Sequence, residues 1–500
     1  MRRLSLKVFP PIWGFWIGIA VFILALIYPL AAALPAAAQH MLAIVLLMIA
    51  WWISEAIPLG VTALLPLVLY PLLRIMPTSK VAPNYTDHLI FLFLGGFLIS
   101  IALQEWQLHK RFALFTLAIL GNNPRKILWA MMLSSGMISM WLSNTATVLM
   151  LLPICLALIH QLQEESDQFK DGTFKFAAVL LLAIAYGSSI GGIATPVGTP
   201  PNIIFLGIYA KFFPDSPSLS FFQWMLYMTP LSIFLLIFVW CYLGFVVLRK
   251  KDLPLTRSKL HFREKYRELG SLNVAQKWVL GIFFLTAILW IFRSEIDLEF
   301  YTFPGWPALL GLEDYIQDST IAMGMSILLF VVQVPDASQR VPLLKLQNIF
   351  QIPWDIVLLF GGGFALAEGI QQSGLAEFIG SKLQFLNNFS PWLVLYLLTL
   401  SATIFTEFTS NTSVATTLLP ITAVLASSIH FNPMFLMVPV TIACSCAFML
   451  PVSTPPNAIV FGTRYIPIKI MAGIGAILVL TISFLVSLYF YLVFYFFPIN

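Results

Sequence analysis

Charged residues are scarce in this sequence. The chain has 500 residues, of which 10% are charged and 59% are hydrophobic. A soluble chain carries about 25% charged residues, so the composition argues against a soluble protein. Apolar stretches of about 18 residues or more with few charges are typical of transmembrane helices, and the chain has many, among them 12–34, 224–248 and 467–490. We therefore expect an all-α, multi-pass integral membrane protein.

Cysteine and histidine are also few. The four cysteines lie in apolar segments, and their spacing fits neither a zinc site nor a disulfide framework; they are Cys155, Cys241, Cys444 and Cys446. The six histidines lie in loops or at the ends of apolar runs, and the sequence contains no HExxH. A serine nucleophile needs a neighbouring base. An intramembrane hydrolase is therefore disfavoured, and we expect no enzyme and no catalytic residues.

The positive charges gather in short polar segments. The stretch 249–268 holds eight Lys or Arg against three Asp or Glu, and three positive residues precede the first apolar run. Loops rich in Lys and Arg stay on the cytoplasmic side, so we expect a cytoplasmic N-terminus and an uncleaved first span. The net charge of +5 follows from these segments, and we expect no nucleic acid as a partner.

The apolar runs predict eleven spans and two hairpins. Two runs, 127–159 and 391–429, carry the tripeptide SNT near their centres, and each fits a hairpin that enters and leaves on one side. Two spans, 177–212 and 433–464, are interrupted by "GSSIGGIATPVGTPPN" and "VSTPPN", which cannot continue a regular helix. Such a break survives at membrane depth only where protein or a cavity surrounds it. The other predicted spans are 12–34, 41–56, 59–75, 89–106, 224–248, 277–293, 319–334, 354–375 and 467–490.

The two halves of the sequence repeat each other. The SNT motifs begin at 143 and 410, and Gly96 aligns with Gly363, both 267 residues apart. "GTPPNIIFLG" at 198–207 matches "STPPNAIVFG" at 453–462. The order of spans gives the repeats opposite orientations, and inverted repeats with broken helices are the signature of secondary transporters. A channel or a non-transporting scaffold is the competing interpretation.

The repeat suggests a division of the chain. We expect scaffold helices in 1–88, a first repeat in 89–248, a basic cytoplasmic loop with scaffold helices in 249–353, and a second repeat in 354–500 that ends in the last span. Each repeat contains one hairpin and one broken helix.

The SNT motifs predict a site for an anion and for cations. Ser143 and Ser410 are placed to cap the helix that follows, whose free N–H groups and partial positive charge attract an anion. No Lys or Arg lies near either SNT or either TPPN. Asn144 and Asn411 offer a carbonyl oxygen to a cation and an NH₂ to a carboxylate. Nearby Glu407 is interpreted either as a structural carboxylate that accepts hydrogen bonds from the hairpin backbone or as a proton- or ion-coupling group.

These motifs, together with "WWISEAIPLGVTALLP" at 51–66, resemble the divalent anion/sodium symporter family, over about residues 12–490. The resemblance implies eleven spans with two re-entrant hairpins, a homodimer in a lipid bilayer, elevator-type movement of a transport domain, and sodium ions as coupling ions. It implies that the substrate is contacted by Ser143, Asn144, Thr145, Ser410, Asn411, Thr412, Thr454 and Pro455. It implies a first sodium site of Ser139, Ser143, Asn144 and Gly198, and a second of Thr406, Thr409, Asn411 and Ser453. Thr409 and Ser453 stand where relatives often have alanine.

The function expected from the resemblance is sodium-coupled symport of a C4-dicarboxylate such as succinate, malate or fumarate, in the inner membrane of a bacterium. The alternatives are a sodium-independent dicarboxylate exchanger and a sodium-coupled citrate or sulfate carrier. Hydroxyl residues at 139 and 406 favour sodium coupling, because exchangers are expected to carry basic residues there.

Overall fold

The computed structural model describes residues 11–28, 34–121, 123–164, 175–217, 219–249, 262–297, 302–336, 339–429 and 431–496. Much of the basic stretch 249–268 and the end of the first predicted span lie outside these residues. The described chain is built of helices, with two short antiparallel strand pairs that join Ile296 to Phe303 and Val334 to Val341. Eight of its helices are long and apolar enough to cross a membrane, which confirms the all-α membrane fold; the count of eleven spans stays a prediction.

The N-terminal part is more broken than the sequence suggested. Its elements are α1 (Pro11–Ile27), α2 (Ala36–Ser54), α3 (Leu59–Thr62), α4 (Leu65–Leu72), α5 (Thr78–Val81) and the 3₁₀ turn η1 (Ala82–Thr86). The predicted span 59–75 is thus two short helices, because Pro66 has no N–H to donate to the carbonyl of Thr62. The segment between the predicted spans 59–75 and 89–106 contains α5 and η1.

The first repeat contains one helix more than expected. Its elements are α6 (His88–Glu105), α7 (Leu108–Leu120), α8 (Pro124–Ser139), α9 (Asn144–Glu164), α10 (Lys175–Gly191), η3 (Gly192–Ala194), α11 (Pro200–Phe212), α12 (Phe221–Cys241) and the π-helical η4 (Tyr242–Val247). The segment 109–111, which follows the predicted span 89–106, lies in the first turns of α7. The chain turns between α6 and α7 at Gln107, whose φ is 54°.

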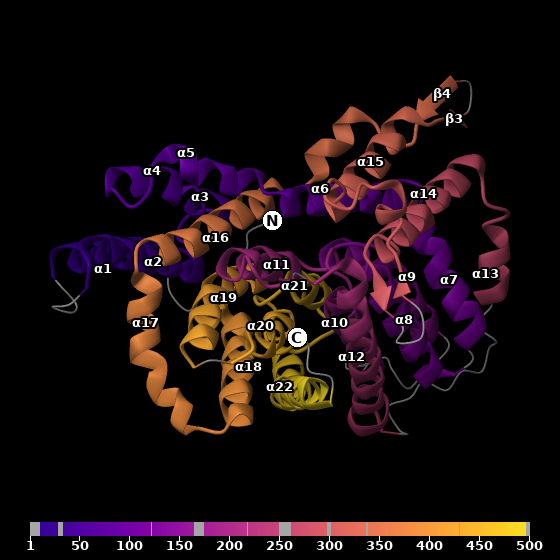
Figure 1. The fold of residues 1–500 in the computed structure, drawn as a ribbon. Coiled ribbons are helices and arrows are strands. Elements are labelled where there is room, and N and C mark those ends of the chain that lie inside the picture. Colours follow the sequence, from indigo (N-terminus) through magenta and orange to yellow (C-terminus); the bar gives the residue numbers. More distant parts are fainter. Residues whose placement is uncertain are drawn as a thin grey trace.

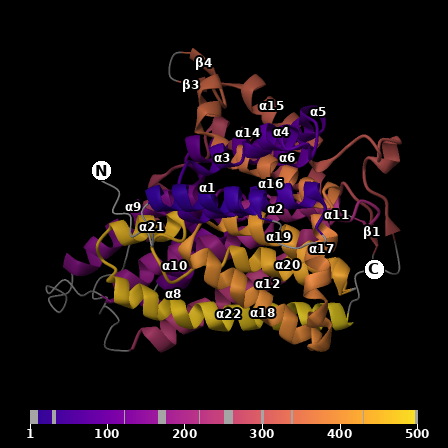
Figure 2. The ribbon, with the colours of Figure 1, turned by 90° about the vertical axis from the view of Figure 1, so that its left-hand side faces the viewer.

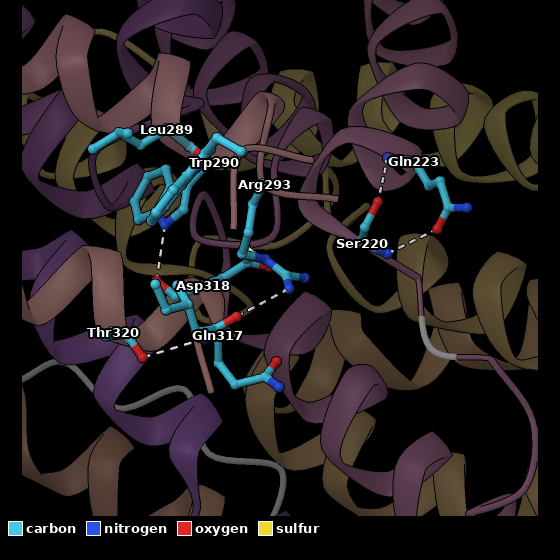
Figure 3. A network of polar contacts seen from close by, with 10 residues as sticks. Ser220, Gln223, Leu289, Trp290, Arg293, Gln317, Asp318 and Thr320 are labelled. Atoms are coloured by element: carbon cyan, nitrogen blue, oxygen red, sulfur yellow. Dashed lines mark hydrogen bonds and ion pairs between the residues drawn. The ribbon is translucent and has the colours of Figure 1, made fainter. Parts of the chain in front are cut away.

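The middle of the chain connects the repeats. It comprises α13 (Phe262–Glu268), α14 (Val274–Ile291), β1 (Ile296–Asp297), β2 (Thr302–Phe303), η6 (Ala308–Leu310), α15 (Asp318–Val331), β3 (Gln333–Asp336), β4 (Gln339–Pro342) and η7 (Leu346–Gln351). A polar network fixes the junction of α14 and α15 (Figure 3): Arg293 donates to the Asp318 carboxylate, and Trp290 Nε1 donates to the Asp318 carbonyl at 2.9 Å.

The second repeat follows the same plan. Its elements are α16 (Trp354–Gln372), α17 (Leu375–Leu383), η8 (Gln384–Asn388), α18 (Pro391–Phe408), α19 (Asn411–Ser428), α20 (Pro433–Cys444), α21 (Pro455–Gly462) and α22 (Ile468–Phe496). Here too an unexpected helix, α17, follows a left-handed residue, Gly374 with φ 78°. Gln107 and Gly374 are 267 residues apart, so the extra helix belongs to the repeat.

The two repeats interlock. Helix α11 of the first repeat packs on α19 of the second, and α21 of the second packs on α9 of the first. The two helices before the breaks, α10 and α20, are almost entirely buried. In both views, α3 to α6 and α14 to α16 form one layer, and α10, α12, α18, α20 and α22 lie in the other (Figures 1 and 2). The first break, 192–199, is buried throughout, as unpaired backbone at this depth requires, whereas the second is buried at 445–448 and 453–454 and exposed at Val452.

Candidate functional site

The first SNT motif lies at a break between two helices. Helix α8 ends at Ser139 and α9 begins at Asn144. Ser143 Oγ accepts a hydrogen bond from the N–H of Ala146 at 3.2 Å, so Ser143 caps α9 as predicted. The cap uses one of the free N–H groups at the start of α9 and leaves others available to a ligand.

The second SNT motif has the same arrangement. Helix α18 ends at Phe408 and α19 begins at Asn411. Ser410 Oγ accepts from the N–H of Ser413 at 3.2 Å, and Ser410 is the N-cap residue of α19. The predicted cap is confirmed here as well.

Each asparagine of an SNT motif is paired with a hydroxyl from the preceding helix. Ser139 Oγ donates to Asn144 Oδ1 at 2.6 Å, and Thr406 Oγ1 donates to Asn411 Oδ1 at 2.7 Å. Both hydroxyl residues are fully buried. Two of the residues predicted for each sodium site are thus in contact, and their oxygens are of the kind that hard cations prefer.

The first broken helix brings backbone oxygens to Asn144. Gly192 is packed so closely that a methyl group on it would lie 2.6 Å from Asn144 Oδ1 and 3.1 Å from the carbonyl oxygen of Gly198. Gly198, predicted as a sodium ligand, therefore lies close to the same small region as Asn144. The sequence reasoning missed Gly192, although its place in the run "SSIGGIATPVG" was a signal of close backbone approach.

The asparagines of the two TPPN motifs hold the broken segments in place. Asn202 Nδ2 donates to the carbonyls of Gly192 and Thr195 at 3.1 and 2.8 Å. Asn457 Nδ2 donates to the carbonyls of Ala447 and Leu450 at 3.1 and 3.2 Å. The two sets of contacts are related by the same offset, 255 residues, as the motifs. These asparagines were not among the predicted site residues, and they act as backbone supports.

The second predicted sodium site is assembled in part. Thr406 Oγ1 lies 2.9 Å from the carbonyl oxygen of Cys444, at the end of α20. Ser453 Oγ donates to the carbonyl of Leu450 at 2.6 Å. The hydroxyl of Thr409 donates instead to the carbonyl of Trp52 in α2 at 3.3 Å. A cation contact from the carbonyl of Thr409 would leave this hydrogen bond in place.

The remaining predicted substrate residues lie at helix starts. Thr454 Oγ1 accepts from the N–H of Asn457 at 3.3 Å and so caps α21, and Pro455 is the first residue of that helix. Thr145 and Thr412 directly follow the two asparagines in the first turns of α9 and α19. The packing of α21 on α9 and of α11 on α19 brings each SNT helix against the broken helix of the other repeat.

Glu407 accepts hydrogen bonds from three consecutive backbone N–H groups. Its carboxylate takes those of Phe448 at 2.6 Å, Met449 at 3.0 Å and Leu450 at 3.1 Å, and the residue is 1% exposed. We expected such bonds from the backbone of the hairpin itself. The donors instead belong to the broken segment between α20 and α21, so the carboxylate joins the hairpin to the broken helix.

The corresponding joint of the first repeat has no carboxylate. Met140 occupies the position equivalent to Glu407, and its carbonyl accepts a hydrogen bond from the Thr195 hydroxyl. The two halves of the site are therefore related in geometry but differ in charge.

A second acidic residue within an apolar helix, Glu368, has partners away from the SNT motifs. Glu368 of α16 accepts from Asn84 Nδ2 at 2.6 Å and lies 3.8 Å from the ammonium of Lys211. Lys211 is at the end of α11, more than two turns from the TPPN motif at its start. This ion pair thus does not bring a fixed positive charge to the SNT motifs.

Comparison with known proteins gives the chain a family. The model of the sodium:sulfate symporter transmembrane region matches residues 11–497. A sodium-dependent dicarboxylate transporter, SdcS, of Staphylococcus saprophyticus is 39% identical over 483 residues, which are 95% of this chain and 91% of the relative. The SdcS protein of Staphylococcus aureus strain RF122 is 40% identical over 465 residues, 92% of this chain and 87% of the relative.

Two solved transporters share the fold at low sequence identity. The YdaH transporter of Alcanivorax borkumensis aligns with a TM-score of 0.50 at 14% identity and covers 83% of this chain and 88% of its own. MtrF of Neisseria gonorrhoeae aligns with a TM-score of 0.52 at 11% identity and covers 92% and 96%. These likenesses concern the fold alone. The match to the family model over almost the whole length, together with the SdcS relatives, shows that the chain belongs to the sodium:sulfate symporter family.

Proposed function

We propose that this protein is a secondary active transporter that carries a C4-dicarboxylate of the succinate, malate or fumarate class together with sodium ions. The observation that carries the proposal is the paired arrangement of Ser139 with Asn144 and of Thr406 with Asn411 at two capped helix starts. The SdcS relatives are named sodium-dependent dicarboxylate transporters, which supports the same substrate class.

The substrate is held by groups that carry no full charge. Each SNT helix start offers free N–H groups and the positive end of a helix dipole, equivalent to roughly half an elementary charge. Two such starts suit the two carboxylates of a dianion. The residues that we assign to the substrate are Ser143, Asn144, Thr145, Ser410, Asn411, Thr412, Thr454 and Pro455.

Sodium ions supply the rest of the positive charge. An ion at the first site takes oxygens from Ser139, Ser143, Asn144 and Gly198, and an ion at the second takes them from Thr406, Thr409, Asn411 and Ser453. The hydroxyls of Ser139 and Thr406 turn their protons away from the ion when it binds, since a hydroxyl oxygen keeps two lone pairs. Each asparagine then binds sodium through Oδ1 and a carboxylate through its NH₂, which couples the two ligands.

Transport follows an elevator-type mechanism in a homodimer. We assign the fixed part to the scaffold helices of 1–88 and 249–353, and the moving part to the two hairpins and the broken helices. In Figures 1 and 2, α3 to α5, α14 and α15 lie on one side of the molecule and α18 and α20 on the other, which supports this division. Because Lys and Arg are enriched on the cytoplasmic side of a membrane, we assign the basic stretch 249–268 and the basic N-terminus to the cytoplasmic side of a bacterial inner membrane.

The family description favours one alternative substrate, since it names sulfate. A sulfate dianion is compact, so at the same two helix starts it would make fewer contacts than a four-carbon dicarboxylate. Uptake of labelled succinate and of labelled sulfate distinguishes the two substrates.

The first prediction is sodium-dependent uptake of succinate. Purified protein in proteoliposomes should accumulate radiolabelled succinate when an inward sodium gradient is imposed, and should do so little with choline or potassium in place of sodium. Equal uptake under both conditions would support a sodium-independent exchanger. Uptake of labelled sulfate without uptake of succinate, malate, fumarate or citrate would support an inorganic-anion carrier.

The second prediction concerns Asn144→Asp and Asn411→Asp. Each change keeps an oxygen for sodium, removes the NH₂ donor and places a negative charge against the substrate. Loss of one donor costs about 1–3 kcal/mol, so the apparent affinity for succinate at saturating sodium should fall by about 5- to 150-fold before charge repulsion is counted. The matched control is Asn123→Asp, because Asn123 caps α8 through its Oδ1 and an aspartate cap keeps that bond. Wild-type affinity in both site variants would show that the asparagines only accept the hydrogen bonds of Ser139 and Thr406 and do not contact the substrate.

The third prediction concerns Glu407→Gln. Glutamine has one acceptor oxygen and an NH₂ that faces the N–H groups of Phe448, Met449 and Leu450. The free energy of unfolding in detergent should fall by about 1–3 kcal/mol, whereas the exposed Glu105→Gln should leave it unchanged. If Glu407 only supports the broken segment, the pH dependence of succinate uptake between pH 6.5 and about 8.5 should keep its wild-type shape. Wild-type stability together with a flattened pH profile would instead identify Glu407 as a coupling group.

A further inference from the structure

A groove lies away from the SNT motifs, between α7, α9 and α13. Its volume is about 540 Å³. The floor is apolar, formed by Leu114 of α7, Ile154 and Leu158 of α9, and Phe262 of α13. In Figure 1 these helices lie together at one side of the molecule. Helix α9 begins at Asn144, so the helix that carries the first SNT asparagine forms one wall of the groove.

The shape of the groove is fixed by bonds between its walls. The guanidinium of Arg111 in α7 donates to the carbonyls of Leu269 and Gly270 at 2.7 Å each and of Ser271 at 2.9 Å. From the other side, Arg263 Nε of α13 donates to the carbonyl of Ala118 at 3.4 Å. These two arginines fasten α13 to α7, so the groove exists before a ligand enters it.

Two lysines on different helices line the groove beside the apolar floor. Lys110 belongs to α7 and Lys265 to α13, both line the groove, and both are exposed. Lys265 Nζ donates to Gln161 Oε1 across the groove at the long distance of 3.4 Å. Glu268 is the acidic residue of the lining, so the positive charge exceeds the negative by one.

We propose that this groove binds an anionic phospholipid. The headgroup phosphate lies between the ammonium groups of Lys110 and Lys265, and the acyl chains cover Leu114, Ile154 and Leu158. A small soluble anion would not cover the apolar floor, and a lipid without net charge would not be attracted by the charges of the two lysines. Basic pockets beside membrane helices are a recognised way to hold anionic headgroups. The inference depends on the membrane fold and not on the transported substrate.

The experiment measures lipid retention by native mass spectrometry. Full-length protein in detergent is titrated with phosphatidylglycerol or with phosphatidylcholine of the same acyl chains. We expect tighter binding of phosphatidylglycerol. Each lysine near a headgroup contributes a factor of about five, so Lys110→Gln or Lys265→Gln should weaken that binding about fivefold, and the double variant about 25-fold. Phosphatidylcholine binding should not change.

Two controls make the result decisive. Lys277→Gln removes an exposed lysine of α14 that does not line the groove and should leave phosphatidylglycerol binding unchanged. The double variant Lys110→Arg/Lys265→Arg keeps both charges and should also retain it, which shows that binding depends on the charge at these positions; unchanged phosphatidylcholine binding by the Gln variants shows that they are folded. Equal binding of the two lipids, or undiminished phosphatidylglycerol binding in the double Gln variant, would overturn the proposal. Displacement of the lipid by inorganic phosphate at millimolar concentration would overturn it in favour of a site for soluble anions.

Discussion

Unwound backbone inside an apolar bundle must find hydrogen-bond partners, and the rest of this structure depends on how it does so. The peptide groups freed at the two helix breaks cannot bond to lipid, and each one left unpaired costs several kcal/mol. Asn202 and Asn457 pair the carbonyls of the breaks, and the carboxylate of Glu407 pairs three N–H groups of the second. With the breaks held in this way, the helix starts next to them keep free N–H groups for a ligand. A site for a dianion can then exist without a lysine or arginine.

The duplication explains the geometry of the site, and the differences between the copies show where the symmetry ends. The pairs Ser139–Asn144 and Thr406–Asn411 are the same contact made twice. The contacts that join each hairpin to its broken helix differ between the repeats. In the first repeat the hydroxyl of Thr195 donates to the carbonyl of Met140, whereas in the second the buried carboxylate of Glu407 accepts backbone N–H groups of the broken segment. A carboxylate with three donors holds its segment more firmly than one neutral hydrogen bond does. We therefore expect the second half of the site to be the more rigid one.

The sequence predicted those parts of the molecule whose physical cause is local. The prolines and glycines of the TPPN segments required a break, the position of serine before asparagine indicated a cap, and hydrophobic length indicated spans. It did not predict α7 and α17. These helices have 13 and 9 residues, contain charged residues and are amphipathic, so their mean hydropathy is too low to distinguish them from loops. The sequence also did not predict contacts between segments that are far apart in the chain. Nothing near Glu407 in the sequence indicates that its partners are 448–450, and the hydroxyl of Thr409 is turned toward Trp52 by packing against α2.

In the function that we propose, sodium ions supply the positive charge that no lysine or arginine brings to the dianionic substrate. Binding linkage makes this testable without transport, because a ligand that assists another must be assisted by it to the same extent. The measurement is equilibrium binding of labelled succinate to the purified protein at constant pH and ionic strength, with sodium replaced stepwise by choline. The account predicts that the dissociation constant for succinate rises steadily as sodium is withdrawn. A dissociation constant that stays the same at every sodium concentration would contradict it.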